Sequence, residues 1–359
     1  MPKQETEILD DVIVRNRRKM LTIGGIALAG FVLPTVLSKD AYAATTYSDS
    51  DILNFALNLE FLEANYYYLS AFGCTIDKPN AAAIAAGAPS GGIPITGSVG
   101  TLGTVSAMGS SSTGTPFTTI QVSSYAVETA IEEGKHVLFL QSALGSSAVA
   151  QPSISLDVST WSALAQAAGV IPSGGAFTPY DTDDDFLVGA YVFEDVGVTA
   201  YHGAAPLLTM SANLSAAAGI LSVEAYHAGL IRTAINAADP TGTSIAAYTT
   251  KISALRAALA LAASPTTLSG AAANPYDTNP DDYGVTTFTT PSGLGGGAAV
   301  TATRITDADQ TNVVAFARTT TQVLNIVTGS GAVKNNAVVS PATGIFFPAG
   351  LNAGPNGFK

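Results

Sequence analysis

The sequence predicts an all-helical protein built around a bundle of four long helices. Apolar residues recur at helical spacing over four segments, which is the pattern of helices that bury one face. In addition, all seven glutamates and all three histidines that follow residue 43 fall within these segments. The expected helices cover residues 49–72, 120–144, 181–210 and 211–238.

Residues 1–43 have the features of a targeting segment. The pair Arg17-Arg18 precedes an apolar run, and the small-residue site Ala41-Tyr42-Ala43 predicts cleavage after residue 43. The segment resembles a twin-arginine signal, although Met20 stands where such signals usually have Phe. The alternative is an uncleaved anchor, because the apolar run of about 18 residues is long enough to span a membrane. We therefore expect export by the twin-arginine machinery, to the periplasm or the outside of the cell.

Charge and cysteine content exclude two classes of protein. Without residues 1–43 the chain has nine basic and 22 acidic residues, a net charge of −13. So acidic a chain does not attract nucleic acid, and we expect no nucleic-acid partner. The single cysteine, Cys74, cannot form an intramolecular disulfide. The fold must therefore be held together by its core or by metal.

The first two helices are separated by a long excursion. Ser48 or Ser50 can cap the helix at 49–72. Residues 74–118 are rich in Gly, Ala, Ser, Thr and Pro without a sustained period, which predicts a crossover or surface loop. The second helix then covers 120–144.

The second half of the bundle begins after a short helix expected at 159–168. In the third helix, 181–210, Pro206 would kink or end the last turn. The fourth helix, 211–238, is followed by an amphipathic fifth helix at 244–263.

The bundle domain is expected to cover residues 44–264. Residues 265–359 are rich in Pro, Gly, Thr and Asn, with a short helix expected at 319–328. We expect this C-terminal extension to wrap the bundle as mostly irregular structure, and not to form a second catalytic domain.

Two of the three histidines follow a glutamate by three residues, in Glu133-x-x-His136 and Glu224-x-x-His227. Residues at i and i+3 of a helix are neighbours, with Cβ atoms about 5–6 Å apart, so each pair can bind one metal together. The other two long helices each supply a carboxylate. This order of ligands is that of di-iron and di-manganese carboxylate bundles. The predicted ligands of two Fe or Mn ions are Glu60, Glu133, His136, Glu194, Glu224 and His227.

Three runs of sequence carry a family resemblance. The runs LNFALNLEFLEA at 53–64 and FEDVGVTAY at 193–201 resemble bacterial ferritin-like domain proteins, which are relatives of the plant desiccation-related proteins. The run FFPAGLN at 346–352 is similar to the closing segment of that family. The resemblance implies a ferritin-like bundle with a two-metal site and implies little about the reaction.

Other polar residues are expected around the ligands. Glu60 precedes Tyr67 by two helical turns, as the first-helix ligand does in ferritin-like proteins, so Glu60 is preferred to Glu63 as the ligand. The alternatives for Glu63 are that it ligates the metals in place of Glu60 or that it lies beside them. Glu128 and Glu132 are expected at the surface or near the ligands. The residues proposed to surround the ligands are Glu63, Tyr67, Tyr191, Tyr201 and His202, with Tyr226 as a further hydrogen-bond donor.

Two classes of function stay open at this point. In the first, the two ions bind O₂ or peroxide, in ferroxidase, peroxidase or catalase-like chemistry, or are held without turnover. In the second, the chain is a structural or stress-protective envelope protein with a non-catalytic or empty site. The expected partners are metal ions, small oxidants and the export machinery. The sequence does not decide whether the metal is iron or manganese, or whether the protein is a homo-oligomer. The long excursion and the tail disfavour assembly into a ferritin cage.

Overall fold

The predicted targeting segment, residues 1–43, lies outside the described part of the chain, as does much of the C-terminal extension. A computed structural model describes residues 47–107, 114–262, 282–289, 301–309, 313–329, 333–334, 337–338 and 345–353.

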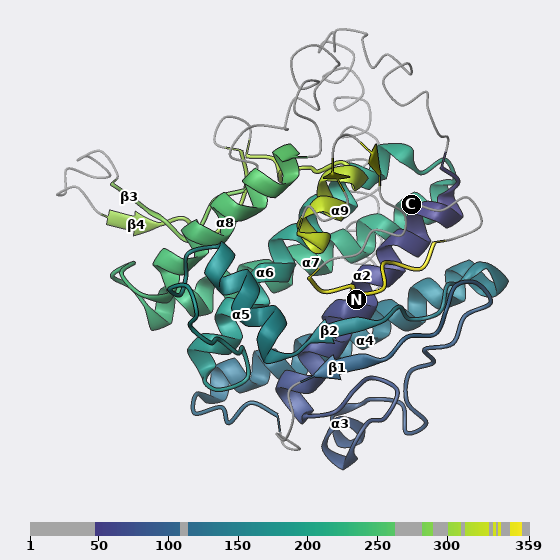
Figure 1. Cartoon of the computed structure of the whole chain (residues 1–359), viewed down its shortest axis with the longest axis horizontal. Coiled ribbons are helices and arrows are strands. Elements are labelled where there is room, and N and C mark those ends of the chain that lie inside the picture. Colours follow the sequence, from purple (N-terminus) through teal and green to yellow (C-terminus); the bar gives the residue numbers. More distant parts are fainter. Residues whose placement is uncertain are drawn as a thin grey trace, which may run out of the picture. The chain divides into compact units, whose positions relative to one another are not determined.

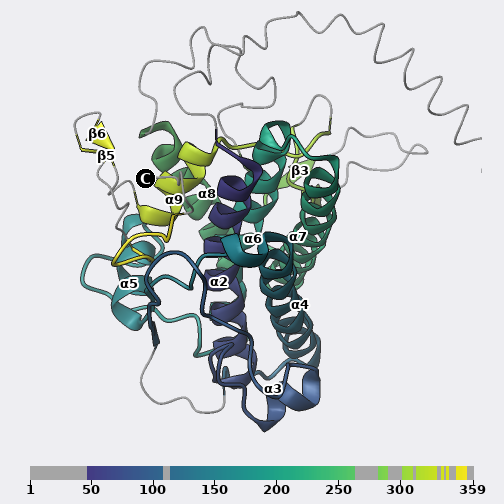
Figure 2. The ribbon, with the colours of Figure 1, turned by 90° about the vertical axis from the view of Figure 1, so that its right-hand side faces the viewer.

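The predicted all-helical bundle is confirmed. Helices α2 (Asp49–Phe72), α4 (Ile120–Leu144), α6 (Asp183–Ala204) and α7 (Ser211–Ala238) form it. Helix α2 packs against α4, and α6 packs against α7 (Figure 1). Seen from the side, the four helices run next to one another (Figure 2). Helices α4 and α7 each turn one face to a shared interior, whereas α2 is enclosed on nearly every side, since most of its residues are buried.

Local sequence explains where these helices start and stop. The Ser48 hydroxyl accepts a hydrogen bond from the amide of Asp51, whose carboxylate accepts one from the amide of Ser48, so that a capping box begins α2. The predicted range of the third helix, 181–210, extends beyond the C-terminal end of the observed helix. Helix α6 stops at Ala204 and a 3₁₀ turn, Ala205–Leu207, follows, because Pro206 has no N–H to continue the α-helical pattern.

The excursion after α2 is more regular than expected. It contains a short helix, α3 (Ala81–Ala86), and strand β1 (Val105–Ala107). Strand β1 pairs in parallel with β2 (Ile154–Leu156), which leads into helix α5 (Val158–Ala167). A three-residue strand is too short to show alternation, and its partner lies far along the chain. The sequence pattern therefore carried no signal of this pairing.

Beyond the bundle, α8 and α9 occupy the positions expected for a fifth and a late short helix. Helix α9 packs on α8 and α6, so part of the C-terminal extension lies on the bundle. The domain boundaries themselves stay a prediction. The remaining elements are α8 (Ile245–Ala262), β3 (Thr287–Thr289) paired antiparallel with β4 (Thr301–Thr303), α9 (Thr320–Thr328), β5 (Val333–Lys334) and β6 (Ala337–Val338).

The last described residues are fastened to the first helix of the bundle. The Asn58 side chain donates a hydrogen bond to the Asn352 carbonyl at 2.8 Å and accepts one from the Asn352 amide at 2.9 Å. The Asn352 side chain also donates to the carbonyls of Thr101 and Ala150, each at 2.8 Å. One residue of the tail thus joins α2, the excursion and the segment before β2.

Asp49, at the start of α2, caps a different helix. Its carboxylate accepts hydrogen bonds from the Thr209 and Met210 amides at 2.9 and 3.0 Å, and from the side chains of Thr209 and Asn213. These groups lie at the start of α7, where unpaired N–H groups favour a negative charge. Burial by itself would raise the pKa of Asp49, but these hydrogen bonds outweigh it and lower the pKa to about 2.

Replacing Asp49 with alanine is expected to reduce the free energy of unfolding by about 1–2 kcal/mol, as the loss of a helix cap does. The pKa of Asp49 is lower in the folded than in the unfolded chain, so its contribution is complete above pH 4 and is lost as the pH falls towards 2. Urea unfolding of wild type and variant over this range measures the difference. The exposed carboxylate variant Asp181→Ala is the control, and a wild-type advantage that does not shrink with acid would contradict the assignment.

Candidate metal centre

The six predicted ligand side chains meet inside the bundle. Each is at most 8% exposed. Within each of two groups, the candidate ligand atoms all lie within 4.8 Å of one another. Glu133 belongs to both groups, so that a carboxylate stands between them. The first group is Glu60, Glu133, His136 and Glu224, and the second is Glu133, Glu194 and His227.

In the first group, one ring nitrogen faces carboxylates from three helices. The Nδ1 atom of His136 is 3.3 Å from Glu60 on α2, 3.4 Å from Glu133 on α4 and 3.5 Å from Glu224 on α7. The i, i+3 pair on α4 is therefore completed by side chains that only the tertiary fold brings near it. The sequence spacing predicted the pair, and the bundle supplies the other two groups.

The second group is arranged around His227 on α7. Its Nδ1 atom is 2.9 Å from Glu133 and 3.5 Å from Glu194. Its other nitrogen, Nε2, is 2.8 Å from the carboxylate of Glu132, which lies at the edge of the bundle. Glu132 is thus positioned to orient the ring, as carboxylates behind metal-binding histidines do. The sequence alone predicts Glu132 at the surface or near the ligands, and the structure shows its contact with His227.

Two of the expected tyrosines contact the candidate ligands. The Tyr67 hydroxyl donates a hydrogen bond to Glu194, and the Tyr201 hydroxyl donates one to Glu60. Each tyrosine therefore holds a carboxylate from a neighbouring helix. Glu63 is buried beside the same carboxylates, and its pKa is raised well above the ordinary value, first by burial and then by the charge of Glu224.

Three other residues considered for the surroundings of the ligands have different partners or exposure. Tyr191 does not contact the candidate ligands: its hydroxyl donates to the Tyr283 carbonyl at 3.2 Å. The His202 ring lies 3.1 Å from the Phe316 carbonyl, on another side of α6. Tyr226 is 71% exposed, because its position between the buried α7 residues turns it outward. His202 and Tyr226 lie on different faces of their helices from the candidate ligands, whereas Tyr191 is a neighbour of Glu194 on α6 whose hydroxyl has another partner.

The charges of the cluster suit a cation. Oxygens of Glu60, Glu133, Glu194 and Glu224 are buried without a hydrogen-bond donor among the described residues. Burial raises the pKa of Glu60 to about 7. For Glu133 burial acts in the same direction, but the nearby rings of His136 and His227 outweigh it by their positive charge and lower its pKa. Buried carboxylates lacking donors are costly unless a cation neutralises them, so the donor set fits a bound metal.

Replacing Glu132 with alanine is expected to weaken metal binding about 10–100-fold, because the ring of His227 loses the carboxylate that orients it. The other helix glutamate outside the cluster, Glu128, is exposed and gives the matched control, Glu128→Ala. Titration of both variants with Co(II), followed by its visible absorption, measures the effect. Equal affinities in the two variants would exclude an orienting role for Glu132.

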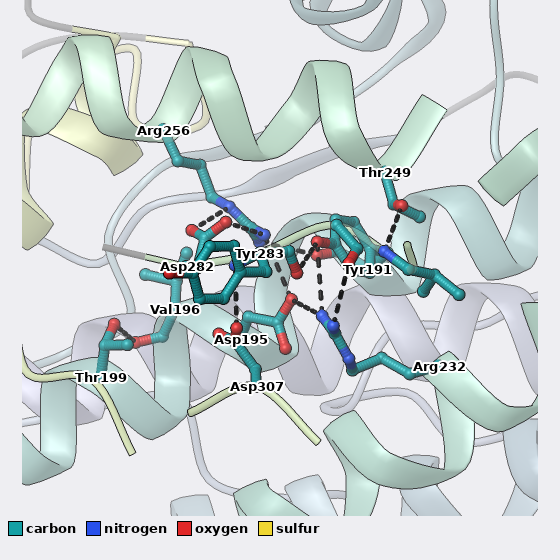
Figure 3. Close-up of polar contacts among 12 residues, drawn as sticks. Tyr191, Asp195, Val196, Thr199, Arg232, Thr249, Arg256, Asp282, Tyr283 and Asp307 are labelled. Atoms are coloured by element: carbon teal, nitrogen blue, oxygen red, sulfur yellow. Dashed lines mark hydrogen bonds and ion pairs between the residues drawn. The ribbon is translucent and has the colours of Figure 1, made fainter. Parts of the chain in front are cut away.

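A second buried polar cluster lies next to the candidate ligands, around Asp195. The Asp195 carboxylate is 3.1 Å from both Arg232 on α7 and Arg256 on α8 (Figure 3). Asp282 in turn pairs with Arg256, at 3.0 Å from Nε, and with Arg318. This ion-pair network joins α6, α7, α8 and two segments of the extension, and it lies one residue from Glu194.

The ion-pair network was missed at the sequence level. Four arginines follow residue 43, and three of them, Arg232, Arg256 and Arg318, are at most 2% exposed. Arginines within otherwise apolar helices were a usable signal, because a buried guanidinium requires an anionic partner.

A four-helix bundle with carboxylates from each helix and two interior histidines defines a class, the ferritin-like carboxylate bundles. Comparison with known families agrees: the ferritin-like domain model matches residues 48–237, and the chain belongs to this family. The desiccation-related protein PCC13-62 of Craterostigma plantagineum is 31% identical over 247 residues, covering 66% of this chain and 72% of that protein. No solved structure matches the chain.

Proposed function

We propose that this ferritin-like protein is exported and binds two Fe or Mn ions, which support redox chemistry with O₂ or peroxide. The observation that carries the proposal is the position of Glu133, which belongs to two candidate ligand groups that each contain a histidine. A carboxylate shared in this way can hold two cations close together, and it offsets part of their repulsion.

Each ion would have its own side chains besides Glu133. Glu60 and His136 would hold the first ion, with Glu224 beside them, and Glu194 and His227 would hold the second. Mixed carboxylate and imidazole ligands suit iron and manganese. Such ions supply reversible changes of oxidation state when bound.

The surrounding residues would keep this centre dry and in place. The tyrosines Tyr67 and Tyr201 restrain Glu194 and Glu60 through their hydroxyl hydrogen bonds. Burial strengthens the attraction between carboxylates and cations, because little water is present to screen it. The four-helix frame thus serves as a rigid support for the ligands.

The alternative is a stress-protective envelope protein in which the centre does not turn over. The curated relative is named for desiccation, which favours this second function. Export by the twin-arginine route, to the periplasm or beyond, is common to both functions and rests on the Arg17-Arg18 pair.

Metal content of protein purified from its native host tests the proposal. About two equivalents of Fe or Mn per chain are expected for a two-metal carboxylate bundle, followed by consumption of O₂ or peroxide by the loaded protein. Bound metal without consumption would favour storage or protection over redox catalysis. A well-folded chain without metal would leave the structural alternative.

A further inference from the structure

An apolar cavity of about 60 Å³ adjoins the candidate metal centre. Its walls come from α2, α5, α6, α7, α8 and α9, from the segment between α6 and α7, and from the segment after residue 344. The ion-pair network helps to close it, since Arg256 is among the lining residues and has its charge satisfied by Asp195 and Asp282. Apolar side chains form most of the wall, including Leu59, Leu62, Val196, Leu255, Val323 and Phe346.

The cavity reaches the candidate ligands themselves. Glu60, Glu63 and Tyr201 belong to its lining, and Glu60 is a member of the first ligand group. Gly197 also lines the cavity, and a Cβ atom placed there would be 2.1 Å from the Glu224 carboxylate. Because Gly197 has no side chain, the Glu224 carboxylate can lie directly against the backbone of α6.

The size and polarity of the cavity define what it can hold. A water molecule needs about 10–15 Å³ measured in this way and two to four polar partners, so the space equals about four to six small groups. Away from Glu60, Glu63 and Tyr201, the wall offers few polar partners. An apolar ligand of several heavy atoms fits this description better than water does.

We propose that this cavity binds a short aliphatic group of a substrate and holds it against the Glu60 side of the metal centre. The assignment of this group to a substrate rests on the proposed function. The binding of an aliphatic group in the cavity does not depend on it. The lining is not closed on every side, because some of its side chains, such as Ala56 on α2, Ala200 on α6 and Leu255 on α8, are only half-buried.

The chain contains its own reporter for this cavity. Trp161 is the one tryptophan of the sequence and is buried. Its ring lies 5.7 Å from that of Phe193 and 5.3 Å from that of Phe346, measured between centroids, and both phenylalanines line the cavity. Filling the cavity is therefore expected to change tryptophan fluorescence.

The probe is 1-butanol, whose five heavy atoms match the size of the cavity, titrated against the full chain and followed by the fluorescence of Trp161. Wild type is expected to bind it saturably. Ala200→Leu and Ala56→Leu, which place a larger side chain into the cavity from α6 and α2, are each expected to weaken binding at least tenfold. Ala237→Leu, the same change on an exposed position of α7, is the matched control and is expected to bind as wild type does.

A second arm measures contact with the metal centre. In Co(II)-loaded protein, 1-butanol is expected to shift the visible absorption of the metal with the same dissociation constant as the fluorescence change. Absence of saturable binding, or equal binding in Ala200→Leu and Ala237→Leu, would overturn the proposal. Binding that leaves the cobalt spectrum unchanged would overturn the substrate assignment. Protein that takes up no metal yet binds 1-butanol in an Ala200-dependent way would retain the cavity as a ligand site and refute the proposed function.

Discussion

The variant Glu133→Ala is expected to lose both metal ions together, although it removes a single side chain. Glu133 is within reach of both ligand groups, at 2.9 Å from the Nδ1 atom of His227 and 3.4 Å from that of His136. Without it, each group lacks a ligand, and the two cations lose the charge between them. Metal analysis should therefore fall from about two equivalents per chain to nearly none.

Single-histidine variants show whether this loss is shared or local. His136→Ala and His227→Ala each belong to one group, so each is expected to reduce the content by about one ion. The exposed neighbour on α4, Glu128→Ala, should keep both ions. Equal metal contents in the Glu133→Ala and Glu128→Ala variants, with helical circular dichroism unchanged, would exclude Glu133 as a shared ligand.

The variant Asp282→Ala is expected to reduce the free energy of unfolding by about 3–5 kcal/mol, because removing one partner of a buried ion pair leaves charge uncompensated. Asp282 is buried, and its carboxylate faces the guanidinium groups of Arg256 and Arg318. These cations keep the pKa of Asp282 below its ordinary value, although burial opposes this. Urea unfolding monitored by circular dichroism measures the loss.

A double variant separates two contributions to this loss: the attraction of the ion pair, and the cost of leaving a buried guanidinium without an anionic partner. In Asp282→Ala, Arg256→Met, one of the abandoned cations is also removed, so part of the lost stability is expected to return. The exposed aspartate variant Asp181→Ala should change little. If Asp282→Ala matched Asp181→Ala, the ion-pair network would not hold the extension on the bundle.

The helices and the candidate ligands could be predicted from the sequence because both depend on short-range spacing. Helical periodicity located α2, α4 and α7 to the residue. The two pairs at i and i+3 needed only a helix to bring their members together. Apart from Asp195, the residues around Glu194 in the sequence are apolar or aromatic, so its burial was also foreseeable from a local pattern.

What could not be predicted depends on contacts between distant residues. The contact of Glu132 with His227 could not be predicted, because it depends on how α7 packs against α4. The glutamates of α4 lie on more than one face, so the sequence alone does not say which of them meets a histidine. Its spacing of three residues from Glu194 predicts Tyr191 beside the candidate ligands, but its hydroxyl instead contacts the Tyr283 carbonyl and the Arg232 guanidinium, which come from distant parts of the chain. Spacing along a helix gives the relative direction of side chains and does not identify the neighbouring element.

The joint between Asn58 and Asn352 has a consequence for the order of folding. The two residues are 294 positions apart, so almost the whole chain must leave the ribosome before α2 gains these partners. Contacts between residues so far apart in sequence form late, and they slow folding because a long loop must close first. The helix that carries Glu60 thus gains these two hydrogen bonds late in folding, once residue 352 has reached it.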